Sequence, residues 1–281
     1  MWSPKTIKRF IRSFPTSTRT ALVETDEGYG YVKAMGNPEG LHTLASEVLA
    51  VELASWLGLP TFEWAIIPVS DLDEIPFEDG ERTQAAAAMP GPAFITRQIS
   101  GQTWYGTIDE LNKLDNAHDI SRLIVFDTWT LNCDRHSVPR PGHEGRARVN
   151  HDNVFLAEAS AGRLHLMAMD HTHCFTCGRD WTVRLAEINN VKDTRLFGVF
   201  PEFRDFVNRE TVRVVLSRLS KFTEAVSDAA LEKLPTAWQV SPGLRAAMSE
   251  FLRRRAVFLV ERFETMFWPQ GELFNDGTGG P

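Results

Sequence analysis

The pattern of the sequence changes near residues 100–101, and this change limits the folds that the chain can adopt. Before it, short β-prone runs alternate with turn residues such as Asp and Gly, which is typical of antiparallel hairpins. After it, apolar residues recur at helical spacing, and the last such segment is a long amphipathic helix near residues 242–268. The pattern predicts an α+β fold of two lobes, a β-rich lobe at residues 1–100 and a mainly helical lobe at residues 101–281.

Charge and composition exclude several classes of protein. Thirty Lys and Arg against 37 Asp and Glu give a net charge of −7, which offers no overall attraction to nucleic acid or to a membrane surface. The apolar stretches fall short of the ~18–20 residues of a membrane span. The basic start of the chain lacks the apolar core of a secretory signal, although it also resembles an organelle transit peptide. Because three cysteines do not indicate a disulfide scaffold, we expect a cytoplasmic protein without membrane contact or direct nucleic-acid binding.

A lysine and a glutamate stand out in the predicted β-rich lobe. Lys33 ends a β-prone run, and Glu47 lies about a third of the way along a predicted helix over residues 41–57. This helix is apolar on most sides, and a carboxylate among apolar neighbours needs a cation. Taken alone, however, Lys33 also suits a solvated strand end.

A second predicted hairpin brings an amide and a carboxylate together. Two β-prone runs, 154–156 and 164–169, are joined by small and turn-forming residues. A centre near residues 160–161, with a register that pairs Leu156 with Met167, places Asn153 opposite Asp170. Opposed residues of an antiparallel pair have Cα atoms about 4.5–5.5 Å apart. Their side-chain oxygens would suit a hard cation such as Mg²⁺.

An acidic residue comes directly after the predicted helix that ends near residue 131. Asp134, followed by Arg135 and His136, leads into the second hairpin. An Asp near a nucleotide-bound metal can orient a hydroxyl and accept its proton. A surface ion pair between Asp134 and Arg135 is the alternative.

Five segments now follow one another in a definite order. They are Tyr31-Val32-Lys33, the helix with Glu47 that leads to Leu57-Gly58-Leu59-Pro60, Phe126-Asp127-Thr128-Trp129-Thr130-Leu131-Asn132-Cys133-Asp134-Arg135-His136, Asp152-Asn153-Val154-Phe155-Leu156, and Met169-Asp170-His171-Thr172-His173-Cys174-Phe175. In this order they resemble the HipA-like protein kinases over most of the chain. The resemblance implies a bilobal fold distantly related to eukaryotic protein kinases and to phosphoinositide lipid kinases.

The resemblance also implies roles and an activity. Lys33 would contact the nucleotide α- and β-phosphates and pair with Glu47, Asp134 would be the catalytic aspartate, and Asn153 and Asp170 would bind Mg²⁺. The implied reaction is ATP- and Mg²⁺-dependent transfer of the γ-phosphate to a hydroxyl, expected to be a Ser or Thr of a protein. A phosphotransferase acting on a small molecule and a catalytically weak nucleotide-binding regulator are the alternatives.

The loop over the phosphates and the metal site depart from the family pattern. The loop at residues 16–20, with Ser17 and Thr18 as nucleotide contacts, contains no glycine. Family members usually place the metal-binding Asn five residues after the Asp, where this chain has Pro139. We therefore assign the role to Asn153, which restores the Asp-Asn-Val-Phe-Leu pattern.

An apparent insertion at residues 137–151 accounts for this shift. Because it joins the expected catalytic residue to the expected metal ligand, both its ends must lie at the active site. We expect it to form a lip on the acceptor side of Asp134, and a mobile, solvated loop is the alternative. Its arginines, which suit an anionic substrate, are Arg140, Arg146 and Arg148.

Three other interpretations remain open. A zinc site at His171, His173, Cys174 and Cys177 is disfavoured, because structural zinc sites normally draw on two separated ligand pairs. The Arg253-Arg254-Arg255 run is expected on the solvated side of the last helix rather than on a DNA-binding face. A small helix-turn-helix protein encoded beside this chain would indicate a toxin–antitoxin pair, with that protein as the partner.

Overall fold

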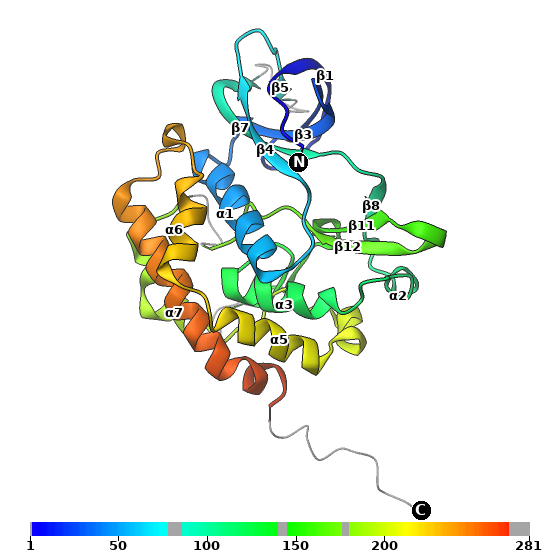
Figure 1. The fold of residues 1–281 in the computed structure, drawn as a ribbon, viewed down its shortest axis with the longest axis vertical. Coiled ribbons are helices and arrows are strands. Elements are labelled where there is room, and N and C mark those ends of the chain that lie inside the picture. Colours follow the sequence, from blue (N-terminus) through cyan, green and yellow to red (C-terminus); the bar gives the residue numbers. More distant parts are fainter. Residues whose placement is uncertain (1, 78–85, 140–144, 176–179, 270–281) are drawn as a thin grey trace, which may run out of the picture.

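An antiparallel sheet forms the N-terminal part of the molecule. The computed structural model describes residues 2–77, 86–139, 145–175 and 180–269. The sheet lies at the top of Figure 1, with the strand order β1-β2-β3-β7-β4. These strands are β1 (Ile7–Ser13), β2 (Ala21–Thr25), β3 (Gly28–Met35), β4 (Trp64–Val69) and β7 (Met89–Arg97), and a separate two-stranded ladder joins β5 (Pro76–Phe77) to β6 (Ala86–Ala87).

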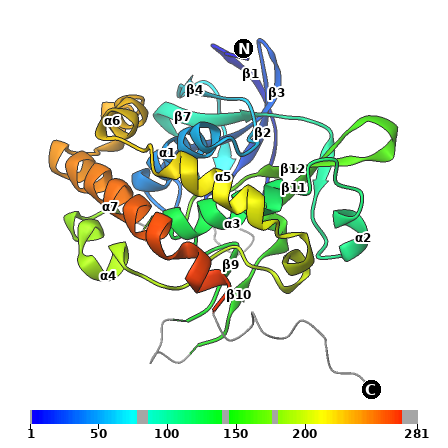
Figure 2. The same ribbon diagram turned by 60° about the horizontal axis from the view of Figure 1, so that its bottom comes forward.

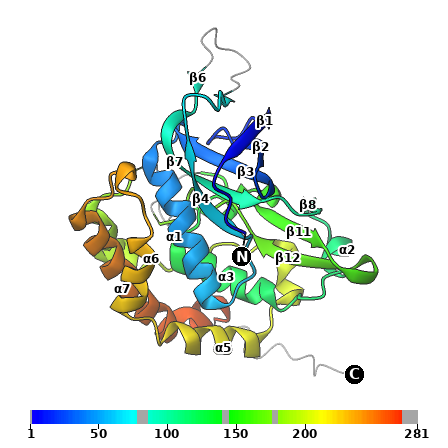
Figure 3. The same ribbon diagram turned by 45° about the horizontal axis from the view of Figure 1, so that its top comes forward.

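The helix α1 (Leu41–Leu57) has the bounds that the sequence predicts. It ends where Gly58 takes a φ of 84°, a left-handed conformation that glycine adopts at little cost. Figures 1 and 3 show α1 between the sheet and the C-terminal helices. Its apolar side chains belong to the larger of two apolar clusters, which extends through α3 (Asp119–Thr130) to α7 (Pro242–Phe267). A carboxylate on α1 therefore lies at the boundary between the sheet and the helices.

The C-terminal part is mainly helical, and α3 packs against both α7 and α5 (Arg209–Leu219), as Figure 2 shows from below. The prediction of an α+β fold with an antiparallel N-terminal sheet and a helical C-terminal part is confirmed, whereas the division at residues 100–101 stays a prediction. The remaining elements are α2 (Ile108–Leu111), α4 (Ile188–Val191), α6 (Glu224–Glu232), the strands β8 (Gly101–Thr103), β9 (His136–Ser137), β10 (Arg148–Val149), β11 (Val154–Glu158) and β12 (Leu164–Ala168), and the short 3-10 helices η1 (His151–Asn153), η2 (Ser160–Gly162), η3 (Val183–Ala186), η4 (Pro201–Phe206) and η5 (Thr236–Trp238).

The second hairpin forms, but its predicted register is wrong by one residue. β11 pairs with β12 so that Leu156 lies opposite Leu166 rather than Met167. The loop is centred on Ala161, which has a φ of 57°. Each residue of β11 therefore lies opposite a residue of β12 that is one position earlier in the sequence than predicted. Asn153 consequently ends η1 just before β11, and Asp170 follows β12, so the two are not a cross-strand pair.

The expectation for the arginine run on α7 is wrong at one position. Arg255 is fully buried rather than solvated. Its guanidinium donates to the backbone oxygens of Thr128 and Trp129 in α3, and to the oxygen of Asp193. A buried arginine can thus donate hydrogen bonds to carbonyl oxygens at helix ends, which have no partner within their own helix and would otherwise bind water. Among the residues that the structure describes, no helix combines the length and apolar character needed to cross a membrane.

Candidate active site

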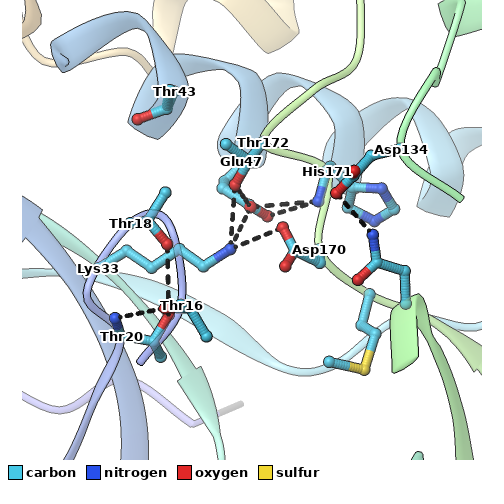
Figure 4. A network of polar contacts seen from close by, with 12 residues as sticks. Thr16, Thr18, Thr20, Lys33, Thr43, Glu47, Asp134, Asp170, His171 and Thr172 are labelled. Carbon is cyan, nitrogen blue, oxygen red and sulfur yellow. Dashed lines mark hydrogen bonds and ion pairs between the residues drawn. The ribbon is translucent and has the colours of Figure 1, made fainter. Parts of the chain in front are cut away.

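A buried lysine joins the sheet to the C-terminal part of the molecule. Lys33 extends from β3, and its Nζ donates to Glu47 Oε1 at 2.5 Å and to Asp170 Oδ1 at 3.0 Å. A third bond from Nζ reaches Thr172 Oγ1 at 3.2 Å. Figure 4 shows these side chains converging on one point from β3, α1 and the segment after β12. The pairing of Lys33 with Glu47 inferred from the sequence is therefore present, and the solvated strand end is not.

The segment after β12 also binds Glu47 directly. The backbone N–H of His171 donates to both carboxylate oxygens of Glu47, at 3.1 and 3.2 Å. The hydroxyl of Thr172 donates to Glu47 Oε1 at 2.8 Å while it accepts from Lys33. Thr172 did not emerge from the sequence, although its position two residues after Asp170 was part of the motif.

The charges in this cluster fix one another's protonation state. Burial acts to lower the pKa of Lys33, but Asp170 and Glu47 outweigh it and raise the pKa above its usual value. Burial acts to raise the pKa of Asp170, but Lys33 outweighs it and lowers the pKa well below its usual range. At neutral pH the lysine is therefore an ammonium and Asp170 a carboxylate.

The backbone at Asp170 has an uncommon conformation. Its φ is 52°, in the left-handed region that residues other than glycine seldom occupy. Such conformations cost energy and persist where the surrounding structure requires them. The carboxylate of Asp170 lies 3.0 Å from Lys33 Nζ, its side chain is 26% exposed, and the residue lines the cavity described below.

A second cluster forms around the expected catalytic aspartate. Asp134 is buried in the turn after α3, and its Oδ2 accepts a hydrogen bond of 2.9 Å from Asn153 Nδ2. The two residues meet although the apparent insertion separates them in sequence. Since the amide N–H of Asn153 is directed at Asp134, its Oδ1 is the atom left to bind a cation. Arg148, on β10, places its Nη2 at 2.7 Å from Asp134 Oδ1.

The expected alternative, a surface pair of Asp134 with Arg135, is wrong. Arg135 is fully buried, and its Nε donates to Asp127 Oδ2 at 2.7 Å. Its Nη1 donates to the backbone oxygen of Met169 at 3.2 Å, immediately before Asp170. Arg135 therefore connects the turn that carries Asp134 to the segment that carries Asp170. Asp127, a lone carboxylate in an apolar helix, was the sequence signal for this cation.

The lysine cluster and Asn153 line a cavity of about 500 Å³, whereas Asp134 lies behind Asn153 and is not among the lining residues. The polar lining includes Lys33, Glu47, Asp152, Asn153 and Asp170. The loop at residues 16–20 contributes Thr16 and Thr20, whereas Ser17 is exposed and Thr18 is buried. The nucleotide contacts expected of Ser17 and Thr18 stay a prediction. The apolar wall consists of Phe14, Tyr31, Val51, Phe62, Phe94, Ile99, Phe155, Ala168 and Met169.

A cavity with a cation and carboxylates at one end and aromatic side chains along its wall suits a nucleotide. The sequence comparison decides the family, because a model of the HipA-like kinases matches residues 8–270. This chain belongs to the HipA-like kinase family. It is therefore a kinase enzyme, as the resemblance implied.

One solved structure agrees with this assignment at the level of the fold. The proinflammatory kinase CtkA of Helicobacter pylori is 13% identical with a TM-score of 0.54, and the match covers 92% of this chain and 96% of that chain. The toxin–antitoxin complex of HipA, HipB and operator DNA from Shewanella oneidensis MR-1 matches with 10% identity and a TM-score of 0.44, over 90% of this chain and 65% of that chain. Among curated proteins, none matches this kinase in sequence.

The zinc site that the sequence analysis disfavoured does not form in the described part of the kinase. Cys177 lies outside the described residues, and within them no three or more His, Cys, Asp or Glu side chains form a metal-binding group. The ring of His171 is buried against Phe126. Burial, and then the charge of Arg135, lower the pKa of His171 to about 3. The ring is thus neutral at physiological pH.

Proposed function

We propose that this HipA-like kinase transfers the γ-phosphate of ATP, with Mg²⁺, to a hydroxyl, and that a Ser or Thr side chain of a protein is the acceptor. The hydrogen bond between Asn153 and Asp134 carries the proposal, because it joins the base to the metal site across the insertion. Positioning and charge neutralisation are most of what phosphoryl transfer requires of a protein.

The residues of the cavity suit a nucleotide with its metal. Asn153 Oδ1 and the Asp170 carboxylate would hold Mg²⁺, which usually takes one or two protein oxygens and completes its shell with phosphate and water. The ion would supply charge neutralisation on the phosphates. Lys33, held by Glu47 and kept charged by its neighbours, is placed to contact the phosphates from the sheet side. Its raised pKa also excludes it as a general base.

Asp134 is the carboxylate that we assign to accept the proton, because it is bonded to Asn153 of the proposed metal site. In the transfer, the bond between the acceptor oxygen and the γ-phosphorus forms as the bond from that phosphorus to the bridging oxygen breaks. The hydroxyl proton moves to the Asp134 carboxylate, and ADP leaves. A positioned base of this kind contributes about 10²–10⁴-fold to the rate.

Two substitutions test the assignment. Asp134→Asn should leave ATP affinity nearly intact and lower phosphate transfer by about 10²–10⁴-fold, whereas Asp170→Asn should weaken Mg²⁺-dependent ATP binding. Calorimetry measures the binding, and radiolabelled ATP measures transfer to the protein itself or to a supplied acceptor. Asp228→Asn, at an exposed position on α6, is the matched control and should change neither. Transfer that survives Asp134→Asn would contradict the role of Asp134.

The alternatives have their own results in this experiment. A parent protein that binds Mg²⁺–ATP tightly and transfers phosphate to no acceptor is a nucleotide-binding regulator. Transfer to small alcohols but to no protein identifies a small-molecule kinase. A helix-turn-helix partner of the antitoxin kind and a cytoplasmic location stay predictions from the sequence, and co-purification from the native host tests the former.

A further inference from the structure

The insertion begins as an ordered arm at the active site. We call its described residues, 137–139 and 145–149, the arm; Arg140 lies outside the described residues. Strands β9 and β10 pair within it, with Ser137 opposite Arg148. Figure 2 shows both strands projecting from the helical part of the kinase. The described arm holds two arginines and no acidic residue.

Four hydrogen bonds fix the base of the arm. Ser137 Oγ donates to the backbone oxygen of Cys133 at 2.8 Å, and the backbone N–H of Asn150 donates to the oxygen of Arg135 at 2.8 Å. Two more come from the segment before η4, where the N–H of Gly198 binds the oxygen of His136 and Arg195 binds the oxygen of Val138. These hydrogen bonds hold β10 beside the turn that carries Asp134, so the fold places Arg148 close to Asp134.

Arg148 covers one particular atom. Asp134 has two carboxylate oxygens, and Asn153 occupies Oδ2. The other, Oδ1, lies 2.7 Å from Arg148 Nη2 and receives no well-aligned hydrogen bond from the described residues. The Arg148 side chain is 55% exposed and that of Asp134 only 9%, so the arginine approaches from the solvent side. An acceptor hydroxyl must reach the same oxygen from that side.

We propose that Arg148 covers the Asp134 carboxylate and makes the kinase prefer acceptors that carry an anionic group beside the reacting hydroxyl. The inference rests on the proposed function and adds the substrate class. A half-exposed ion pair stabilises little, so Arg148 can leave Asp134 at small cost when another anion is offered. Guanidinium binds carboxylate and phosphate in a two-pronged geometry. When such an acceptor binds, its anionic group pairs with the Arg148 guanidinium, and its hydroxyl donates a hydrogen bond to Asp134 Oδ1. A neutral acceptor has no group that can replace Asp134 as the partner of Arg148.

The same contact limits reaction with water. While Arg148 lies on Asp134 Oδ1, the base is unavailable to activate a water molecule beside the γ-phosphate. Removing the arginine should therefore raise ATP hydrolysis in the absence of an acceptor by about fivefold, the order expected for a partly exposed ion pair. A merely structural arginine would not raise it.

The main test compares acceptor preference in three proteins, the parent, Arg148→Ala and Arg184→Ala. Arg184, on η3, forms an exposed ion pair of 2.8 Å with Glu187 outside the insertion and is the matched control. One set of assays uses radiolabelled ATP and peptides with a central Ser flanked by Asp, phosphoserine or Asn. A second set uses small alcohols with and without a phosphate group. We expect the parent and Arg184→Ala to prefer the anionic acceptor by roughly tenfold, the factor for one charge-assisted hydrogen bond.

Arg148→Ala should lose that preference while its affinity for Mg²⁺–ATP stays unchanged. Preference among the peptides identifies a protein acceptor, and preference only among the alcohols identifies a small phosphorylated one. A preference that persists in Arg148→Ala, or a hydrolysis rate that does not rise, would overturn the proposal. These results are distinct from failure of the proposed function, which would appear as a parent protein that does not bind Mg²⁺–ATP or that transfers phosphate to no acceptor.

Discussion

Two aspartate–arginine pairs meet at the turn after α3, and they differ in their exposure to solvent. Arg135 with Asp127 and Arg148 with Asp134 are both 2.7 Å apart. The side chains of the first pair are fully buried, whereas Arg148 is 55% exposed. The two ion pairs thus have the same N–O distance but differ in solvent exposure, and the exposure determines how much each pair contributes to stability.

The buried pair is held from several sides. Asn132 Nδ2 donates to Asp127 Oδ1 at 3.0 Å, and Arg135 also donates to the oxygen of Met169. Charges removed from water in this way require their partners, because a lone one would remain unsolvated. The pair at Asp134 keeps contact with solvent and can exchange partners. Consecutive residues of one turn therefore have different surroundings: Arg135 holds the backbone at Met169, and Asp134 is the residue to which we assign the base.

The largest effect should come from breaking the buried pair. Arg135→Ala leaves the Asp127 carboxylate buried without its cation, and we expect the free energy of unfolding to fall by about 3–5 kcal/mol. Urea denaturation followed by fluorescence measures it. Arg254→Ala, which removes an exposed arginine of α7 paired with Glu250, is the control and should leave the midpoint nearly unchanged. A loss below about 1 kcal/mol would show that the buried pair is not needed.

A glycine packed on Asp127 gives the next largest effect. At Gly198 an added Cβ would overlap the Asp127 carboxylate, whereas at Gly162 it would meet nothing within 4 Å. Both glycines have a φ of 72°, so the backbone strain of an alanine is the same at each. Gly198→Ala should therefore cost about 1–3 kcal/mol more stability than Gly162→Ala. Equal losses in urea denaturation would mean that Asp127 moves aside freely.

The buried lysine cluster should respond less, since one neutral group is removed. Thr172→Val keeps the shape of the side chain but takes one hydrogen-bond donor from Glu47 and one acceptor from Lys33. We expect a loss of about 1–3 kcal/mol in the free energy of unfolding. Thr172→Ser should recover most of it. If Val and Ser behave alike in thermal denaturation, the methyl group rather than the hydroxyl matters.

The carboxylates Glu47 and Asp127 show how much of the site could be predicted from the sequence. The bounds of α1 and the need of Glu47 for a cation followed from local pattern, because helical periodicity and a lone carboxylate among apolar residues are visible along the chain. That Lys33 is this cation was implied by the family resemblance. The reasoning that selected Glu47 applies equally to Asp127. A cation for Asp127 would have placed Arg135 in the interior and removed the alternative of a surface pair with Asp134. The assignment of the five kinase residues came instead from their order, which resembles a family.

Other features depend on contacts that local pattern does not contain. The register of the second hairpin depends on the conformation of Ala161 at the centre of its loop. The burial of Arg255 depends on carbonyl oxygens from α3 and from the segment before Arg195, far apart in sequence. The position of Arg148 depends on the hydrogen bonds at the base of the arm. Each of these features depends on contacts between residues that are not neighbours in the sequence. Sequence periodicity shows only which side of a helix or strand is apolar, so it could not predict them.

The smallest effect on stability should come from the exposed pair, and this sharpens the comparison most. Arg148→Ala should change the free energy of unfolding by less than about 1 kcal/mol, because solvent screens a half-exposed arginine. A double-mutant cycle with Asp134→Asn measures the coupling directly, and we expect it to fall as salt is raised from low to physiological concentration. The equivalent cycle of Arg135→Ala with Asp127→Asn should give several kcal/mol and little salt dependence. Similar coupling in both cycles would mean that Arg148 is part of the folded framework, and an arginine so held could not leave Asp134 for an acceptor.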